Sequence, residues 1–356
     1  MKENTRNYWQ IAAGDTNRNY TDLCLEWDVV LTGNGCMGAY PECLEKLSWV
    51  TTRKKTDLGR FCAEVKHGDV VILRQGTDQV DGIGVVVGDY EHREVFGDID
   101  GWDLQHVRRV KWLTRKQKKF QTHTMKLGDT TQKLDINKSS EIINWMKSLN
   151  LELDKEYTAE YLRSIPPDED LQLEIKDIST RLFDQGIADY SIQALVEELS
   201  GFVRIAEWYA KIQYWEANKG PSEYETLTYL VVPLLKVLGW TPQRMAIEWN
   251  NIDIALFDQL PREDNNLNVV VEVKKKGNSC LTAVRQAESY AANKKKCNRL
   301  IVTDGLRYGV YIKSEQEFKL YAYLNIRNLK SGYPIFNCKG AAEALQAMTP
   351  EGVRLG

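Results

Sequence analysis

Histidine, paired cysteines and long apolar runs are scarce or missing in this 356-residue sequence. The four histidines are scattered between His67 and His123, which argues against a zinc finger or a histidine-metal nuclease. The seven cysteines are odd in number and form no Cys-x-x-Cys pair, so we expect reduced thiols in a cytosol. No apolar stretch approaches about 20 residues and no signal peptide is evident, which predicts a protein that neither spans a membrane nor is secreted.

A phosphate-binding loop and a strongly basic composition are also missing. No Gly-x-x-x-x-Gly-Lys-Ser/Thr sequence occurs, so ATP-driven translocation is not encoded in this chain. The formal net charge is −3, but basic residues gather at 104–128, 274–276 and 294–299. Such groups suit a phosphate backbone, although each taken singly is more typical of a solvated surface. The candidate backbone contacts are Arg108, Arg109, Lys111, Lys275 and Lys276.

Two short apolar runs in the last third of the chain carry charged residues. Asp253 lies in 251–256, and Glu272 and Lys274 lie in 269–274; both runs predict largely buried strands. Glu272 and Lys274 are two residues apart, so they project from one face. Buried carboxylates are costly unless they are paired or bind a metal, and such a group can position water for phosphodiester cleavage. Alone, this pattern also arises by chance, often as a surface salt bridge.

A helix is predicted directly before these strands, over 222–240. Ser222 is a suitable N-cap, and Glu225 stands three residues later at the spacing of a capping box. Apolar residues then recur at helical spacing until Gly239, which suits a helix end. Pro233 lies inside this run and is a candidate kink.

A second helix is predicted after the strands, over 283–292. Gln286 and Tyr290 lie one turn apart on one face of it. Two more strand-like runs follow at 300–305 and 308–312. The predicted order is therefore helix, strand, strand, helix, strand, strand.

This order and these motifs resemble the PD-(D/E)xK nuclease superfamily, and most closely the nuclease domain at the N-terminus of type I restriction motor subunits. The resemblance covers about residues 216 to 328. It implies that Asp253 and Glu272 are the main ligands of Mg²⁺, with Mn²⁺ as an alternative, and that Glu225 assists them. It further implies that Lys274 orients the attacking water and offsets charge in the transition state. Gln286 supports the site in many members of this family.

Two choices within this set have rivals. Glu223 competes with Glu225, which we prefer because its distance to the downstream proline and glycine fits the family helix better. Lys275 and Lys276 compete with Lys274. Side chains two residues apart lie on the same face of a strand, and only Lys274 has this spacing from Glu272.

The first 115 residues contain short strand-like runs separated by Gly and Asp turns, which predicts a small β-barrel. The clearest runs are 68–71, 82–90 and 109–113. The Gly-Ile-Gly at 82–84 is not a dinucleotide fingerprint, because it lies between strands with no following helix.

This arrangement resembles the EVE/PUA-like barrel, especially the version at the N-terminus of some modification-dependent restriction enzymes. The resemblance implies a flipped, modified base held in an aromatic cage, where stacking and base-edge hydrogen bonds offset the cost of unstacking. For each aromatic residue, a place in the barrel core is the commoner role. The candidate pocket residues are Trp27, Asn34, Tyr40, Trp49, Asp69, Tyr90 and Trp102, with Asn34 or Asp69 as readers of the base edge.

The predicted fold class is a multidomain α/β and α+β protein. Its expected parts are an EVE/PUA-like barrel at 1–118, a helical linker or interface region at 119–215, a nuclease domain with a central mixed sheet flanked by helices at 216–330, and a tail at 331–356. In the helical region, an apolar stripe between Leu195 and Ile212 suits either packing onto the nuclease domain or a dimer interface.

The two resemblances together predict a modification-dependent, type IV-like restriction endonuclease in the cytoplasm of a prokaryote, acting in phage defence. The expected partner is double-stranded DNA with modified cytosine or adenine. A homodimer or higher homo-oligomer is expected, because one nuclease domain normally cuts one strand. Two alternatives stay open. In one, the barrel senses a nucleotide or other ligand and the nuclease is its effector; in the other, the protein is an RNA-processing nuclease.

Overall fold

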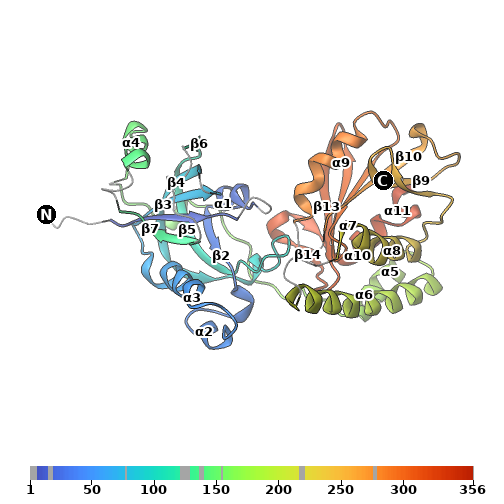
Figure 1. The fold of residues 1–356 in the computed structure, drawn as a ribbon, viewed down its shortest axis with the longest axis horizontal. Helices are drawn as coiled ribbons and strands as arrows, with labels where there is room; N and C mark the ends of the chain where they lie inside the picture. Colours follow the sequence, from blue (N-terminus) through green and yellow to red (C-terminus); the bar gives the residue numbers. More distant parts are fainter. Residues whose placement is uncertain are drawn as a thin grey trace. The chain divides into compact units, whose positions relative to one another are not determined.

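The computed structural model describes every residue except 1–5, 15–18, 77, 121–128, 136–139, 154, 216–220, 276–278 and 356. The chain divides into two compact units, Met1–Glu169 and Asp170–Gly356 (Figure 1). Each unit contains one mixed sheet with helices, so the fold is mixed α/β, as predicted in outline. The division at Glu169 falls inside the region expected to be a helical linker. Within the described residues, no helix is long and apolar enough to cross a membrane.

The first unit is built on a seven-stranded sheet. Its strands are β1 (Tyr8–Ala12), β2 (Val29–Thr32), β3 (Val70–Gln75), β4 (Gln79–His92), β5 (His106–Thr114), β6 (Lys118–Lys119) and β7 (Thr131–Lys133). They follow the order β2-β5-β4-β3-β1-β7, with β6 paired to β4, and only β1 and β3 are parallel neighbours. Among the described residues this path ends at β2 and β7, two short strands that do not pair. The sheet is therefore open, whereas a closed barrel was predicted.

Short helices surround this sheet. They are α1 (Thr21–Glu26), η1 (Gly35–Met37), α2 (Cys43–Lys46), α3 (Thr52–Gly59), η2 (Arg60–Glu64), η3 (Glu94–Phe96), α4 (Ser140–Ser148) and η4 (Ala159–Tyr161). Asp57 of α3 accepts hydrogen bonds from the backbone N–H groups of Thr130 (2.6 Å) and Thr131 (2.7 Å), which fastens the edge strand β7 to the helix.

The long strand β4 depends on glycine where it crosses β5. A Cβ atom at Gly84 would lie 2.5 Å from Val110 Cγ1 and 2.6 Å from the Lys111 carbonyl oxygen. The pairing register also shifts between Ile83 and Gly84. Glycine therefore permits a close approach of the two strands that no other residue would allow.

The second unit is built on an eight-stranded sheet. Its strands are β8 (Met245–Trp249), β9 (Ile252–Phe257), β10 (Leu267–Val273), β11 (Arg299–Thr303), β12 (Arg307–Ser314), β13 (Glu317–Asn325), β14 (Gly332–Tyr333) and β15 (Cys338–Lys339). Their order is β14-β15-β13-β12-β11-β10-β9-β8, and the pairs β10–β11 and β13–β15 are parallel. The strands predicted from the apolar runs at 251–256 and 269–274 are confirmed as β9 and β10, and the structure shows that they are antiparallel neighbours.

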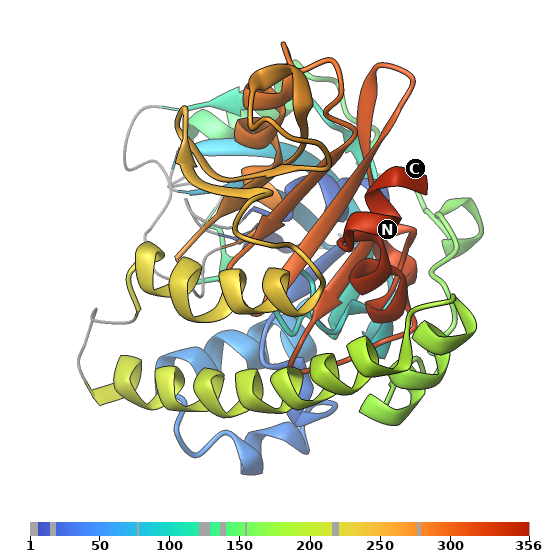
Figure 2. The ribbon, with the colours of Figure 1, turned by 90° about the vertical axis from the view of Figure 1, so that its right-hand side faces the viewer.

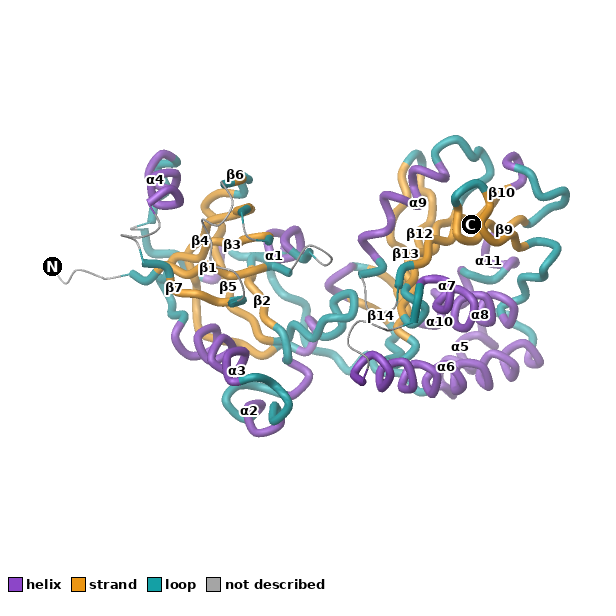
Figure 3. The backbone as a smooth tube through the Cα atoms, viewed as in Figure 1, coloured by secondary structure: helices purple, strands orange, loops and turns teal. Residues whose placement is uncertain are grey.

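Helices cover both faces of this sheet (Figure 3). They are α5 (Ile175–Asp184), α6 (Asp189–Trp215), α7 (Glu223–Thr226), η5 (Leu227–Val231), α8 (Val232–Val237), α9 (Val284–Ala291), α10 (Ala341–Ala347) and α11 (Pro350–Leu355). On one face α5, α6, α8 and α10 share a core with β9, β10 and β12, and α6 packs against α8 (Figure 2). On the other face α9 packs against β10 and β11.

The helix predicted over 222–240 is present, but it is not regular. The segment η5 is a π-turn between α7 and α8, and Pro233 stands at the start of α8. Proline lacks an N–H and its ring clashes with the carbonyl four residues earlier, so a wider turn before it keeps the helix continuous. The segment expected as a tail, 331–356, also belongs to the core: Ala341, Leu345 and Met348 are fully buried in it.

Candidate functional site

Asp253 and Glu272 come together because β9 and β10 are antiparallel neighbours. Ile254 pairs with Val271, so the two carboxylates occupy the next positions along their strands. Asp253 Oδ2 accepts a hydrogen bond of 2.6 Å from the backbone N–H of Val273. Burial raises the pKa of Asp253, while the Val273 N–H and the charge of Lys274 oppose this shift. The sheet thus holds two carboxylates side by side where β10 ends.

Glu272 is almost completely buried, with 1% of its surface exposed. Its Oε1 accepts a hydrogen bond of 2.5 Å from Lys274 Nζ, whereas its Oε2 has no hydrogen-bond partner within the described residues. Burial raises the pKa of Glu272 to about 6; the hydrogen bond from Lys274 opposes this rise and the charge of Asp253 adds to it. A buried acceptor without a donor is costly, so this oxygen is available to a ligand.

Lys274 connects Glu272 to the helix α9. Its Nζ also donates to Gln286 Oε1 at 3.0 Å, and Gln286 Nε2 donates to Tyr290 OH at 3.1 Å. The prediction that Gln286 and Tyr290 share one helix face is confirmed. Burial alone would lower the pKa of Lys274, but its hydrogen bond to Glu272 and the neighbouring carboxylates raise it overall. The side chain is therefore a fixed ammonium group.

Glu225, the helical acid chosen from the sequence, does not join this cluster. Its Oε2 accepts a 2.6 Å hydrogen bond from the Ser222 N–H, and its own N–H donates to Ser222 Oγ at 3.1 Å. This capping box lowers the pKa of Glu225, whose side chain lies in solvent. The predicted capping box is confirmed, and it uses the carboxylate that we had expected near a metal.

Glu223 is the acidic residue of this helix that interacts with the cluster. Desolvation raises the pKa of Glu223; the charge of Lys274 lowers it, and the charge of Asp253 raises it. The Lys275 backbone N–H also forms a hydrogen bond with the Glu223 carboxylate. The rival residue is thus the one within electrostatic range. The capping box could have shown this, because it commits Glu225 and leaves Glu223 as the unassigned acid.

The cluster suits a hard divalent cation. Within the described residues no three His, Cys, Asp or Glu side chains form a ready-made metal cage. Mg²⁺ does not need one, because it keeps several waters and is often held by one or two carboxylates together with substrate phosphates. Asp253 and Glu272, with the unpartnered buried Glu272 Oε2, are oxygen donors that fit such an ion, and the charge of Glu223 acts on the same cluster.

Asp69, a proposed reader of the base edge, has a structural role instead. It is 4% exposed and accepts hydrogen bonds from Trp9 Nε1 (2.8 Å), the Lys66 N–H (3.0 Å) and the Asn7 N–H (3.1 Å). Asn7 Nδ2 is a further donor at 3.3 Å. Both carboxylate oxygens are occupied, so Asp69 ties β1 to the turn before β3 and is not free to bind a base.

The candidate aromatic residues lie in different surroundings. Trp27 is buried with the Arg163 guanidinium 3.8 Å from its ring centre, and Trp102 makes an edge contact with Tyr20 at 5.8 Å. Trp49 is 68% exposed. These three side chains have separate neighbours, which argues against one cage built from the whole predicted set.

Tyr40 and Tyr90 do meet. The Tyr40 N–H donates to Tyr90 OH at 3.0 Å, and the same hydroxyl lies 2.7 Å from His106 Nδ1. Asn34 lies nearby, in a left-handed conformation with a φ of 67°, and its backbone interacts with His106. Burial lowers the pKa of His106 to about 4, and the adjacent His92 adds to this shift, so His106 is neutral. Our sequence analysis gave neither histidine a role; His92 is the last residue of β4, and His106 is the first residue of β5.

The residues predicted to contact phosphates also differ in their exposure and hydrogen bonding. Arg108 is 2% exposed and donates to the carbonyl oxygens of Phe61 (3.2 Å) and Cys62 (2.7 Å), so it is a framework residue and not a surface contact. Arg109 is half-buried and donates to the Arg163 carbonyl oxygen at 2.5 Å. The list is completed by Lys111, half-buried on β5, Lys275, half-buried after β10, and Lys276, which lies outside the described residues.

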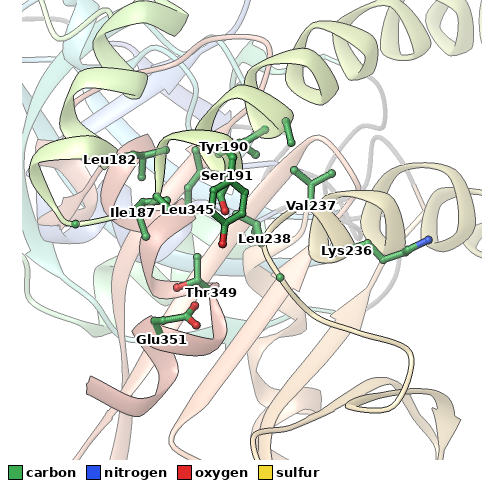
Figure 4. Close-up of a pocket in the computed structure, with 15 residues that line it drawn as sticks. Leu182, Ile187, Tyr190, Ser191, Lys236, Val237, Leu238, Leu345, Thr349 and Glu351 are labelled. Carbon is green, nitrogen blue, oxygen red and sulfur yellow. The ribbon is translucent and has the colours of Figure 1, made fainter.

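A cavity of about 570 Å³ lies elsewhere in the second unit (Figure 4). It is bounded by the α5–α6 turn, the end of α8 and the α10–α11 segment. Figure 4 shows the Tyr190 ring at its centre and the amine of Lys236 pointing away. Val237 and Leu238 line it at one end of the helix that begins with Glu223, so the cavity and the carboxylate cluster share no residue.

Residues 9–134 match a family described as a domain of unknown function, DUF8426. The matched span runs through the sheet of the first unit, from β1 to β7. None of the curated proteins matches the chain. The carboxylate cluster of the second unit lies outside the matched span.

Proposed function

We propose that this protein is a divalent-metal-dependent endonuclease of the PD-(D/E)xK type that cleaves DNA carrying a modified base. In this proposal the second unit hydrolyses the phosphodiester bond, and the first unit is an EVE/PUA-like module that binds the flipped base. The biological role would be restriction of phage DNA.

One observation carries the catalytic part of the proposal. Glu272 is buried, shares one oxygen with Lys274 and leaves the other without a donor in the described part of the chain, next to Asp253. A carboxylate that only stabilised the fold would have both oxygens satisfied. The order α7–α8, β8, β9, β10, α9, β11, β12 also supports the nuclease interpretation, because it agrees with the order predicted from the motifs except for one strand, β8, that was not predicted.

Each residue of the cluster has a distinct task in this mechanism. Asp253 and Glu272 would hold the cation and Glu223 would assist them; the cation would supply Lewis-acid polarisation of the phosphodiester and a water of lowered pKa. Lys274 is held in place by Glu272 and Gln286, so its ammonium group faces the negative charge that develops on the phosphate. Tyr290 fixes the Gln286 amide, and through it the lysine.

Recognition of a modified base is proposed for the first unit. Asn34 and Tyr90 support this part of the proposal because both contact one buried, neutral histidine, His106, and the Tyr40 backbone bonds the Tyr90 hydroxyl. The Tyr40 and Tyr90 rings offer stacking surface, while the Tyr90 hydroxyl is already engaged. Asp69 and Arg108 are left out of the proposed interface because both are committed within the fold.

Cleavage of matched duplexes with Mg²⁺ tests the proposal. The duplexes carry cytosine, 5-methylcytosine, 5-hydroxymethylcytosine, its glucosylated form or N6-methyladenine. We expect cutting of one modified substrate only, and loss of cutting but not of DNA binding in Asp253→Ala. Full cleavage by Asp253→Ala would exclude the site. Cutting of all duplexes alike would instead favour an effector nuclease controlled by another ligand, and preference for RNA would favour RNA processing.

A double-strand break requires two cutting centres, so we propose that the active species is a homodimer or a higher homo-oligomer. Sedimentation of the protein with and without the cleaved duplex tests this. A monomer that produces double-strand breaks at a rate linear in its concentration would contradict it.

A further inference from the structure

One cation beside the cluster has no assigned role. Arg285 is on α9 directly before Gln286, so their Cα atoms are about 3.8 Å apart. Gln286 in turn bonds Lys274 Nζ. The Arg285 side chain is exposed, and within the described residues it forms no hydrogen bond and no ion pair.

Several other cations of the second unit form ion pairs. Lys294 contacts Asp264, Arg307 contacts Asp304 at 2.8 Å, and Arg354 contacts Asp258 at 2.6 Å. Arg285 has an acidic residue one turn further along its own helix, Glu288, yet no ion pair joins the two. The guanidinium is therefore available to a ligand.

The net negative charge of the carboxylate cluster explains why a further cation such as Arg285 is needed there. Glu223, Asp253 and Glu272 bring three negative charges when ionised, and Lys274 brings one positive charge. The excess is two negative charges, which a divalent cation only cancels. A nucleic acid strand adds one negative charge for every phosphate, so its approach needs further cations close to the site.

Arginine is well suited to this task. Its guanidinium is always charged and presents paired N–H donors that match two phosphate oxygens. Lys275, directly after Lys274, is an alternative, but its side chain is half-buried. Arg285, directly before Gln286 on α9, is the more exposed of the two.

We propose that Arg285 binds a backbone phosphate adjacent to the scissile one, and that the cleaved strand therefore runs along the first turn of α9. This inference rests on the proposed nuclease function and adds a residue that positions the substrate. It requires no contact with a base, so it applies to every sequence and modification that the enzyme cuts.

The test compares Arg285→Ala, Arg285→Lys and Lys236→Ala in the full-length chain. Lys236 is a matched control: it is an exposed cation at the end of α8, and about 13 residues of helix, roughly 20 Å, separate it from Glu223. Equilibrium binding of a labelled duplex is measured without divalent metal at several salt concentrations. The kcat and KM for cleavage are measured with Mg²⁺.

For Arg285→Ala we expect Kd and KM to rise roughly tenfold and the salt dependence of binding to fall by about one ion, with kcat changed less than about twofold. Arg285→Lys restores part of the affinity, and Lys236→Ala behaves like the natural protein. An unchanged Kd and salt slope in Arg285→Ala would overturn the inference, as would a loss confined to kcat. If the natural protein cuts no substrate, the proposed function fails, and the binding measurements still decide the role of Arg285.

Discussion

Two buried carboxylates, one in each unit, were both expected from the sequence to be functional. Asp69 in the first unit is 4% exposed and Glu272 in the second is 1% exposed, so burial does not separate them. Their hydrogen bonds do. Asp69 has donors on both oxygens, whereas Glu272 has a donor on one oxygen only, within the described residues. A fully satisfied carboxylate stabilises a fold, and a half-satisfied one is prepared for a ligand.

Substitution of Glu272 should have the largest effect on activity and little effect on folding. We expect Glu272→Gln to lower the Mg²⁺-dependent cleavage rate by on the order of a thousandfold, equivalent to about 4 kcal/mol of transition-state stabilisation. The free energy of unfolding should change little, because the amide removes a charge that is costly to bury and keeps an oxygen acceptor for Lys274. Cleavage rates and urea unfolding of the same preparation check both statements. Undiminished cleavage by Glu272→Gln would mean that Glu272, like Asp69, has no role in catalysis.

Substitution of Asp69 should give the opposite result. Asp69→Ala leaves Trp9 Nε1 and the Lys66 N–H without an acceptor inside the first unit. We expect a loss of about 3 kcal/mol in the free energy of unfolding of that unit. Asp69→Asn should lose less, since one oxygen acceptor is kept. Urea unfolding followed by tryptophan fluorescence measures the loss; a stable Asp69→Ala variant with altered base preference would return Asp69 to the binding site.

The two acids of the α7 helix allow a closer comparison. Glu223→Gln should lower cleavage and Mg²⁺ affinity by roughly 10- to 100-fold, because Glu223 interacts with Asp253. Glu225→Gln should leave both unchanged and cost less than about 1 kcal/mol of stability, since it only weakens a cap. Titration of cleavage against Mg²⁺ concentration distinguishes them. The reverse ranking would restore Glu225 as the helical ligand.

The smallest expected effect concerns pH. The pKa of Glu272 is raised from 4.5 to about 6, so the folded protein holds this proton more tightly than the unfolded chain does. Without metal, stability should therefore decrease by on the order of 1 kcal/mol as pH rises from about 4.5 to about 6. Bound Mg²⁺ favours the ionised carboxylate and lowers its pKa, so cleavage should rise with pH below this window. Urea unfolding at several pH values measures this dependence of stability on pH. In Glu272→Gln the decrease should be smaller by the contribution of Glu272. The same decrease in both proteins would mean that another group titrates.

Local patterns predicted much of the second unit. The β-branched runs around Asp253 and Val271 gave two strands, and the spacing of Gln286 and Tyr290 gave one helix face, because these features depend on near neighbours in the chain. The alanines near 341–347 gave no comparable pattern, so a core helix was taken for part of a tail.

Contacts between segments far apart in the chain could not be predicted from the sequence. Asp69 meets Trp9 across 60 positions, and Arg108 meets Phe61 across 47, so nothing near either residue showed that its hydrogen bonds were satisfied. The closed barrel failed for a similar reason: alternation predicts strands, but it does not say which two edges will pair. The choice of Glu225 over Glu223 relied on its distance to Pro233 and Gly239, and that distance did not reveal that the capping box uses the Glu225 carboxylate.

The π-turn η5 has a further consequence for how this gene can change. A π-turn adds one residue to a helix without changing its ends, so deletion of one residue within 227–231 would leave a regular helix. The apolar side chains after Pro233 would keep their packing, and Glu223 on the other side of the turn would keep its direction. A one-codon deletion here could thus preserve both the fold and the position of the helical acid. The same deletion elsewhere in this helix would turn one end against the other by about 100°.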